Sequence, residues 1–262
     1  MRFSIVTICF NSEKTIERTI KSVLSQTCKD YEYIIVDGAS KDGTLDIVKK
    51  YEPLFEGRMK WKSEPDTGIY NAMNKGVKRA TGQIIGIVNS DDWLEPDALE
   101  KVNESFVSNN CDMNSLYCGG IFFHFIEGGV KHGLVNIKAL KKNAWLYIVS
   151  GVRHPGLFVP QKIYDEVGLF NDKMRLSADL DFMLRCYYQG KRFVDIKAIV
   201  SNMSEGGIST DETKRSMQIS QSDRKIMLKG FGKTGFSFLF LYYSWFFRVY
   251  FKSFVKKIGL YK

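Results

Sequence analysis

The first part of the chain alternates between short apolar runs and longer segments whose apolar residues recur at helical spacing. The runs predict strands, and the segments between them predict helices. The last run is rich in isoleucine and valine, which favours a strand buried on both faces of a parallel sheet. The alternation therefore predicts an α/β protein with a doubly wound, mostly parallel central sheet and right-handed crossovers. The predicted strands lie at residues 3–9, 33–36, 60–63 and 82–88.

Beyond about Phe106 the alternation is less regular. Apolar runs still predict strands at residues 116–125, 156–159 and 198–203. A short helix is expected over residues 161–167, and a second begins near residue 176 and ends before Gly190. The second half therefore belongs to the same α/β body.

Two adjacent carboxylates, Asp91 and Asp92, follow the strand predicted at residues 82–88. Ligands of open α/β sheets bind at the carboxyl ends of strands. Like charges held this close repel each other unless a cation or a proton joins them. Mg²⁺ or Mn²⁺ holding a substrate diphosphate is the natural partner. The alternative is a strand followed by a helix N-cap, because residues 95–97 open a helix in the usual way.

Polar residues also mark the ends of the first two predicted strands. These are Thr7 and Asn11 at the first strand, and Asp37, Ser40 and Asp42 at the second. A single aspartate after a strand is more often turn chemistry, but several that converge on one sheet edge predict a nucleotide crevice. Neither the G-x-G-x-x-G fingerprint nor the G-x-x-x-x-G-K-[ST] loop occurs. The nucleotide is therefore held differently from that of a dehydrogenase or an ATPase.

Length and composition fit one large domain or two closely joined halves, with 262 residues, 44% hydrophobic and 26% charged. The formal net charge of +9 equals the nine Lys and Arg residues after Asp223, where no acid occurs, so the preceding chain is neutral. Nucleic-acid binding is disfavoured, because such proteins carry a basic surface on the folded body. The five cysteines lack C-x-x-C spacing, which disfavours a disulfide framework or a zinc site and favours a reducing compartment. The first apolar run is too short for a signal peptide.

The C-terminal tail combines aromatic residues with positive charge. Residues 236–247 carry no charge, but a bilayer-spanning helix needs ~20 apolar residues, so this stretch does not predict one. In the following segment apolar residues keep helical spacing, while Arg248, Lys252 and Lys256 lie on another side. A basic amphipathic helix of this kind is typical of binding to an anionic membrane surface. The alternative is a helix packed on the protein's own body.

Several segments together resemble the family 2 glycosyltransferases with the GT-A fold, over roughly residues 1–210. They occur in the order VTICFN, IIVDGASKDGT, SEPDTGIYNAMNKG, IIGIVNSDDW and SADLDFMLR. The third segment is similar to bacterial members that build capsule, exopolysaccharide or lipopolysaccharide repeat units. The resemblance implies transfer of a sugar from a nucleotide diphosphate donor with inversion at the anomeric carbon.

The resemblance also implies roles for the residues near the nucleotide. Thr7 and Asn11 match residues that line the nucleotide pocket, and Asp37 matches the residue that hydrogen-bonds the base, commonly a uracil. The donor is therefore expected to be a UDP-sugar. Asp66 lies in the equivalent of a second nucleotide-contacting loop.

In the same family, Asp91 and Asp92 match the acidic metal motif, with Asp92 as the direct ligand of Mn²⁺ or Mg²⁺. Many members carry an acid where this chain has Asn89. An amide oxygen can still ligate a hard cation, but without adding charge.

Asp179 matches the general base of the family. A sugar hydroxyl is a poor nucleophile until a carboxylate takes its proton, an effect of ~10²–10⁴ in rate. Asp181 is the second choice for the base, and a helix N-cap is the structural alternative for Asp179. His154 stands where the family often has a histidine, and it would contact the diphosphate, complete the metal shell or remain a neutral structural residue. Trp93 would form the floor of the acceptor site or pack in the core.

Three functions compete on these residues. The leading hypothesis is an inverting, metal-dependent glycosyltransferase whose acceptor is a glycan or a polyprenyl-diphosphate-linked sugar. A sugar nucleotidyltransferase would carry a glycine-rich basic loop after the first strand, where this chain has Phe10-Asn11-Ser12-Glu13. A non-catalytic nucleotide-sugar-binding or assembly subunit at the membrane would have no need of both the acid pair and Asp179.

We therefore expect a glycosyltransferase domain at residues 1–225, divided into a nucleotide-sugar-binding half (1–106) and an acceptor half (107–225). Residues 226–262 are expected to form a tail that binds the membrane surface through C-terminal amphipathic helices. The enzyme would then be cytoplasmic and peripheral at the inner face of the plasma membrane.

Overall fold

The computed structural model describes residues 2–126, 128–135, 152–205 and 214–233, together with 235, 239–240 and 242–243. Within these residues the chain forms one nine-stranded sheet in the order β3-β2-β1-β4-β8-β6-β9-β5, with β7 paired to β6. The strands are β1 (Phe3–Cys9), β2 (Tyr31–Asp37), β3 (Met59–Ser63), β4 (Ile84–Ile87), β5 (Trp93–Leu94), β6 (Ser115–His124), β7 (Val130–Gly133), β8 (Leu157–Pro160) and β9 (Arg192–Ser204).

The N-terminal half of the sheet is parallel, as the alternation predicts. β1 pairs with both β2 and β4, and β2 pairs with β3, all in parallel. Every residue of β1, β2 and β4 is buried, which explains why their sequences are apolar runs without alternation. The predicted α/β class and the doubly wound N-terminal half are confirmed.

The C-terminal half of the sheet contains antiparallel pairs that the apolar pattern does not reveal. β8 runs antiparallel to β4 and to β6, and β7 runs antiparallel to β6. β9 pairs in parallel with β6, and the short β5 adds to β9 in the antiparallel sense. This last pairing brings the residues after β4 next to the end of β9, although they are far apart in the sequence.

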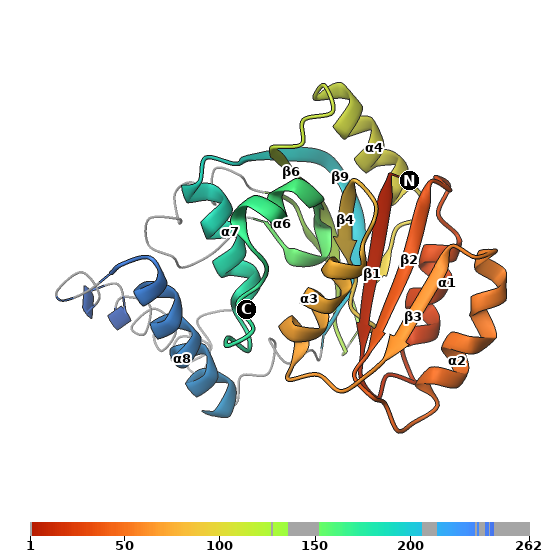
Figure 1. The fold of residues 1–262 in the computed structure, drawn as a ribbon, viewed down its shortest axis with the longest axis horizontal. Coiled ribbons are helices and arrows are strands. Elements are labelled where there is room, and N and C mark those ends of the chain that lie inside the picture. The colour runs from red at the N-terminus through yellow and green to blue at the C-terminus, as the bar shows by residue number, and fades with distance from the viewer. Residues whose placement is uncertain are drawn as a thin grey trace.

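Helices cover both faces of the sheet (Figure 1). One hydrophobic cluster joins the sheet to α1, α2 and α4, and the other joins it to α3, α6, α7 and α8. The cores therefore lie on either side of the central strands β1 and β4. The bounds are α1 (Ile16–Leu24), α2 (Thr44–Tyr51), α3 (Ile69–Arg79), α4 (Ala98–Ser108), α6 (Gln161–Val167), α7 (Ala178–Tyr188) and α8 (Lys214–Gly230), with 3₁₀ turns η1 (Glu52–Phe55) and η2 (His154–Gly156).

Helix α8 runs across residue 225, where the sequence suggests the end of the catalytic body. Met227 and Leu228 are buried and belong to the same hydrophobic cluster as α7, and Figure 1 shows α8 beside α7. The first residues expected in the tail therefore pack on the body. Among the described residues, no helix is long and apolar enough to cross a bilayer. The amphipathic segment expected at residues 247–258 lies outside the described residues.

Candidate active site

A cavity of about 1000 Å³ opens at the carboxyl ends of β1 and β4, between the two halves of the chain. Its lining includes residues that the sequence already marks as candidates, namely Asn11, Asp42, Asp66, Asn89, Asp91, Asp92, His154 and Asp179. The volume is at the upper end of the ~300–1,000 Å³ typical of small-molecule sites, which suits an extended ligand.

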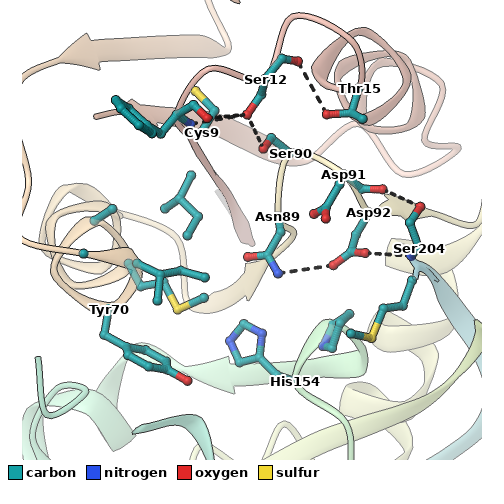
Figure 2. Close-up of a pocket in the computed structure, with 18 of the residues that line it drawn as sticks. Cys9, Ser12, Thr15, Tyr70, Asn89, Ser90, Asp91, Asp92, His154 and Ser204 are labelled. Atoms are coloured by element: carbon teal, nitrogen blue, oxygen red, sulfur yellow. Dashed lines mark hydrogen bonds between the residues drawn. The ribbon is translucent and has the colours of Figure 1, made fainter. Parts of the chain in front are cut away.

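The acid pair lies on the turn between β4 and β5 (Figure 2). The helix that follows begins only at Ala98, so neither acid caps it. Asp92 is 2% exposed; its Oδ1 accepts the backbone N–H of Ser204 at 3.2 Å, and its Oδ2 accepts Nδ2 of Asn89 at 3.2 Å. The helix-cap alternative for these residues is therefore wrong.

The surroundings of Asp92 disfavour its charged form. Burial raises the pKa of Asp92, and the neighbouring Asp91 raises it further, to about 7, although the hydrogen bonds from Ser204 and Asn89 oppose the shift. The site therefore favours any group that adds positive charge beside the pair.

The side-chain oxygen of Asn89 shows whether this site suits a metal ion. Its Oδ1 is buried and has no hydrogen-bond donor within reach. The amide cannot simply be turned over, because its Nδ2 donates to Asp92, and exchanging the two atoms would set oxygen against oxygen. A buried amide oxygen without a donor, next to two carboxylates, fits a hard divalent cation.

No group of three His, Cys, Asp or Glu side chains that could hold a metal ion occurs among the described residues. Mg²⁺ sites commonly use one or two carboxylates and take further ligands from substrate phosphates and water. Asp91, Asp92 and the Oδ1 of Asn89 fit that pattern. His154 also lines the cavity and appears below Asn89 and Asp92 in Figure 2.

Arg18 on α1 holds the turn that carries Asp91 and Asp92. Its guanidinium donates to the backbone oxygen of Asp91 at 2.7 Å and to Oγ of Ser204 at 2.8 Å. It also lies 3.6 Å from the centre of the Trp93 ring, which packs 4.5 Å from the ring of His124. Trp93 is not part of the cavity lining, so the structure places it in packing rather than in an acceptor floor.

Asp179 is on the first turn of α7, on the part of the cavity formed by the second half of the chain. Its Oδ1 accepts a hydrogen bond of 3.1 Å from the hydroxyl of Tyr70, on α3. Burial, and then the charge of Asp179, raises the pKa of Tyr70 well above its usual value, so the phenol keeps its proton. Burial lowers the pKa of His154 against the opposing charge of Asp179, which favours a neutral ring.

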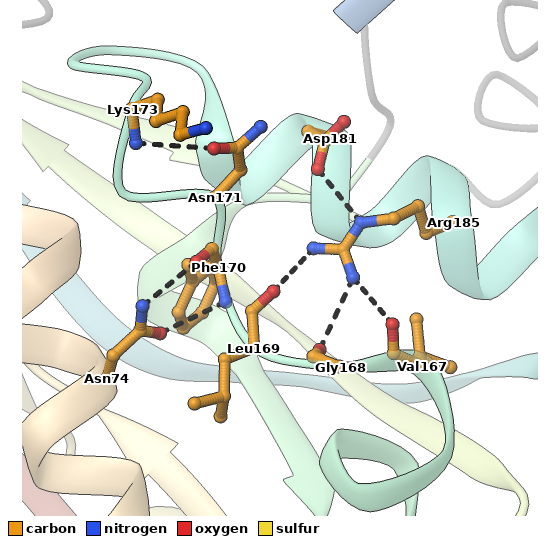
Figure 3. Close-up of polar contacts among 9 residues, drawn as sticks. All are labelled: Asn74, Val167, Gly168, Leu169, Phe170, Asn171, Lys173, Asp181 and Arg185. Atoms are coloured by element: carbon orange, nitrogen blue, oxygen red, sulfur yellow. Dashed lines mark hydrogen bonds and ion pairs between the residues drawn. The ribbon is translucent and has the colours of Figure 1, made fainter. Parts of the chain in front are cut away.

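Asp181 has a different environment from Asp179 (Figure 3). It is 6% exposed and forms an ion pair of 2.9 Å with Nε of Arg185. The same guanidinium donates to the backbone oxygens of residues 167–169, at the end of α6 and just beyond it. Asp181 is not part of the cavity lining and orients a structural arginine.

The expected nucleotide residues divide into two groups. Asn11 and Asp66 line the cavity, whereas Thr7, Asp37 and Ser40 do not. Thr7 is buried and accepts the hydroxyl of Tyr33 at 3.0 Å.

Asp37 is fully buried and supports the cavity through the residues that hydrogen-bond to it. Its carboxylate accepts the N–H of Ser40 at 3.0 Å and the hydroxyls of Ser40 and Ser63. The hydroxyl of Ser40 in turn accepts the backbone N–H of Asn11 at 2.8 Å. Asp37 therefore holds the loop that presents Asn11. A Cβ on the intervening Gly38 would lie 2.6 Å from Oδ2 of Asp66, so any larger residue there would displace the Asp66 side chain.

Several residues of this site are not among those predicted from the sequence. Phe10 lines the cavity and is 61% exposed, an unusual position for phenylalanine directly after a buried strand. That position is a signal the sequence already contains. Tyr70, Arg18 and Ser204 gave no comparable signal, because their partners lie far along the chain.

Comparison with known proteins adds to this geometry. Residues 4–168 match the sequence profile of the family described as Glycosyl transferase family 2. The chain is 31% identical over 189 residues to a PGL/p-HBAD biosynthesis glycosyltransferase of Mycobacterium bovis, covering 71% of this chain and 69% of that protein. Over 108 residues it is 38% identical to TuaG of Bacillus subtilis, assigned to teichuronic acid biosynthesis, covering 41% of this chain and 43% of TuaG.

Among solved structures the fold is similar to that of GalNAc-T7 with UDP, GalNAc and Mn²⁺. The TM-score is 0.65 at 15% identity, and the match covers 87% of this chain and 48% of that protein. The chain therefore spans about half the length of that protein and has the GT-A fold.

Proposed function

The chain belongs to glycosyl transferase family 2, and on this premise we propose that it is an inverting, metal-dependent glycosyltransferase of surface polysaccharide biosynthesis. It moves a sugar from a nucleotide diphosphate sugar, expected to be a UDP-sugar, to a hydroxyl of a glycan or a polyprenyl-diphosphate-linked sugar. The similarity to TuaG and to the mycobacterial glycosyltransferase supports the pathway class. One observation carries the proposal: a single cavity holds the acid pair with the unpartnered Asn89 oxygen and also holds Asp179.

Asp179 is the general base in this proposal. Tyr70 occupies Oδ1 of the carboxylate and leaves Oδ2 to receive the proton of the acceptor hydroxyl. As that proton moves, the acceptor oxygen forms its bond to the anomeric carbon. The bond from that carbon to the diphosphate oxygen breaks, and the electron pair leaves with the nucleoside diphosphate. A neutral His154 beside Asp179 would not neutralise the base.

Asp91, Asp92 and the Oδ1 of Asn89 would hold Mn²⁺ or Mg²⁺, with His154 as a further candidate ligand. When bound, the cation would offset charge on the departing diphosphate, an effect of several kcal/mol. Arg18 and Ser204 hold the turn on which the acids sit, and so orient them.

The nucleoside is proposed to lie along the carboxyl ends of β1 and β2. Asn11 and Asp66 would contact it, while Thr7, Asp37 and Ser40 shape the edge on which it rests. Asp37 would reach the base directly only with a change in the Ser40 loop.

A thermal-shift screen tests the proposal, because a ligand that binds only the folded state raises the melting temperature. UDP-, GDP- and dTDP-sugars are compared with and without Mn²⁺. We expect a UDP-sugar to stabilise strongly only with the metal. GDP- or dTDP-sugars stabilising instead would overturn the base assignment, and equal stabilisation without metal would overturn the cation site.

Activity is tested with the Asp179→Asn variant. Release of UDP from the donor should fall by ~10²–10⁴ while binding of UDP with Mn²⁺ is kept, because the base acts only in the chemical step. Asp165→Asn is the matched control, since Asp165 is exposed on α6 and outside the cavity. Full activity of Asp179→Asn would overturn its role, and binding without any UDP release by the unmodified protein would favour the non-catalytic alternative.

We also propose that the C-terminal tail, through its basic amphipathic segment at residues 247–258, binds the anionic inner face of the plasma membrane. Co-sedimentation with vesicles tests this, with phosphatidylglycerol vesicles compared with phosphatidylcholine vesicles. Binding to the anionic vesicles should weaken when Arg248, Lys252 and Lys256 are replaced by Gln, and it should fall with salt. Equal binding to both vesicle types, or to neither, would contradict the proposal.

A further inference from the structure

Helix α8 contributes a buried carboxylate to the support of the catalytic cavity. Asp223 is 2% exposed. Its oxygens accept the backbone N–H groups of Arg175 at 3.0 Å, Leu176 at 2.7 Å and Ser177 at 3.0 Å. A carboxylate that gathers successive backbone N–H groups fixes the conformation of the segment, because each bond is charge-assisted.

The segment held by Asp223 leads directly into the proposed base. Arg175 and Leu176 line the cavity, and Asp179 follows on the first turn of α7. The N-cap residue of α7, Ser177, makes no side-chain cap of its own. Asp223 is thus a negative group from another helix at the start of α7, where the helix dipole favours one.

The surroundings of the Asp223 carboxylate disfavour its charged form. Burial raises the pKa of Asp223; the three backbone N–H groups oppose the shift, and the charge of Asp179 adds to it. A buried carboxylate near a second carboxylate is an expensive way to pack a helix, since apolar residues of similar volume often serve as well or better.

Helix α8, which carries Asp223, packs against the hydrophobic core. Met227 and Leu228, on the next turn, are buried in the cluster that also contains Ala178 and Phe182 of α7. This helix lies beyond residues 4–168, the part that matches the family profile. Helix α8 does not line the cavity but holds residues 175–177, which lead into Asp179, and it lies outside the residues that match the family profile.

We propose that Asp223 is a positioning residue for glycosyl transfer: by holding residues 175–177 it fixes the base Asp179 relative to the acceptor hydroxyl. The inference rests on the proposed role of Asp179. A misplacement of about 1 Å costs ~10²-fold in rate, so loss of these bonds acts on the chemical step. The donor side of the cavity is built from other elements and is unaffected.

The test uses Asp223→Asn in the full chain, which keeps the shape of the side chain but turns an N–H₂ group toward backbone donors. UDP release from UDP-glucose, UDP-galactose, UDP-GlcNAc and UDP-GalNAc is measured with water as acceptor, and binding of UDP with Mn²⁺ is measured by calorimetry. We expect UDP release to fall by about 10- to 100-fold and the UDP affinity to change less than twofold. Leu228→Ala is the structural control: it should lower the melting temperature and leave UDP release below that temperature unchanged.

A double-mutant cycle with Asp179→Asn separates positioning from general damage. If Asp223 acts through Asp179, then Asp223→Asn has no further effect once Asp179 is Asn. Unchanged UDP release by Asp223→Asn, an equal loss in Leu228→Ala, or an undiminished effect in the Asp179→Asn background would each overturn the inference. If Asp223→Asn does not fold, Asp223→Glu is tested instead, because it keeps the negative charge but places it one methylene further from the backbone. The same results are then expected, and the same results would overturn the inference.

The two proposals fail in different ways. An Asp179→Asn variant with full UDP release, or an unmodified protein that releases no UDP, counts against the proposed function. Loss of activity in Asp179→Asn with normal activity in Asp223→Asn counts against the role of Asp223 alone.

Discussion

The hydroxyl of Tyr70 lies 3.1 Å from Oδ1 of Asp179 and donates a hydrogen bond to it. Tyr70 belongs to α3, in the first half of the chain, and Asp179 belongs to α7, in the second half. The Tyr70 ring also packs at 5.9 Å from the ring of Phe170, which contacts His154 at 6.0 Å. This bond therefore joins the two halves of the cavity at the proposed base.

Replacing Tyr70 with Phe should lower UDP release by about 10- to 100-fold, because it removes a hydrogen bond to a charged group but keeps the ring, a loss of ~1.5–3 kcal/mol. Affinity for UDP with Mn²⁺, measured by calorimetry, should stay unchanged. Tyr164→Phe is the control, since Tyr164 packs 5.9 Å from the same Phe170 ring but does not line the cavity. Equal loss in both variants would show that packing, not the bond to Asp179, is responsible.

Replacing Asp92 with Asn should have opposite effects on stability and on metal binding. Without metal the variant should melt a few degrees higher, because one of two repelling carboxylates becomes neutral. The stabilisation that Mn²⁺ adds in the presence of UDP should disappear. The measurement is a thermal melt with UDP, with and without Mn²⁺ and after chelation. A variant that keeps the full Mn²⁺ shift would exclude Asp92 as a ligand.

Asn74 joins α3 to the segment after α6 through a pair of reciprocal hydrogen bonds (Figure 3). Its Nδ2 donates to the backbone oxygen of Phe170 at 2.9 Å, and its Oδ1 accepts the Phe170 N–H at 3.0 Å. Asn74→Ala leaves both buried backbone groups unsatisfied and should lower the free energy of unfolding by ~2–4 kcal/mol. Urea unfolding measures the loss. Asn71→Ala, on the more exposed side of the same helix, should change stability by less than ~1 kcal/mol, and a similar loss there would contradict the assignment.

Glu32 should make stability depend on pH in acid. The side chain is fully buried. It accepts bonds from Ser4 at 2.7 Å, from the N–H of Thr81 at 2.6 Å and from Lys60 at 3.0 Å. Burial alone would raise its pKa, but these bonds outweigh burial and lower the pKa to about 2.

Because the pKa of Glu32 is lower in the folded chain than in the unfolded chain, its contribution is complete above about pH 4.5 and is lost as the pH falls toward 2. That contribution is roughly 3 kcal/mol. Chemical unfolding between pH 7 and pH 2.5 should show a steeper loss in the unmodified protein than in Glu32→Gln. Glu104→Gln, at an exposed position of α4, should follow the unmodified protein. Parallel curves for Glu32→Gln and the unmodified protein would contradict the assignment.

The apolar pattern predicted the parallel half of the sheet well. The runs at residues 3–9, 33–36, 60–63 and 82–88 correspond to β1, β2, β3 and β4 within a few residues. Buried parallel strands and their crossover helices have strong local patterns, so little beyond the local sequence is needed. The helix expected at residues 161–167 is α6 as predicted.

The second half was less accessible to sequence analysis. β9 extends over thirteen residues, and its N-terminal part is only partly buried, so it lacks a clear apolar run. β5 has two residues and exists because it pairs with β9, a partner that no local pattern can indicate. A strand of this length depends on its neighbour for stability.

By itself the sequence determined the α/β class, the position of the acid pair at the end of a buried strand, and the candidate residues Asp91, Asp92 and Asp179. Tertiary structure alone decided that Tyr70 reaches Asp179, that Arg18 supports the acidic turn, and that Asp223 ties down the start of α7. Periodicity reports whether a residue is buried, because burial follows from the local geometry of a strand or helix. It does not report which partner a side chain meets, because that depends on how elements far apart in the chain pack together.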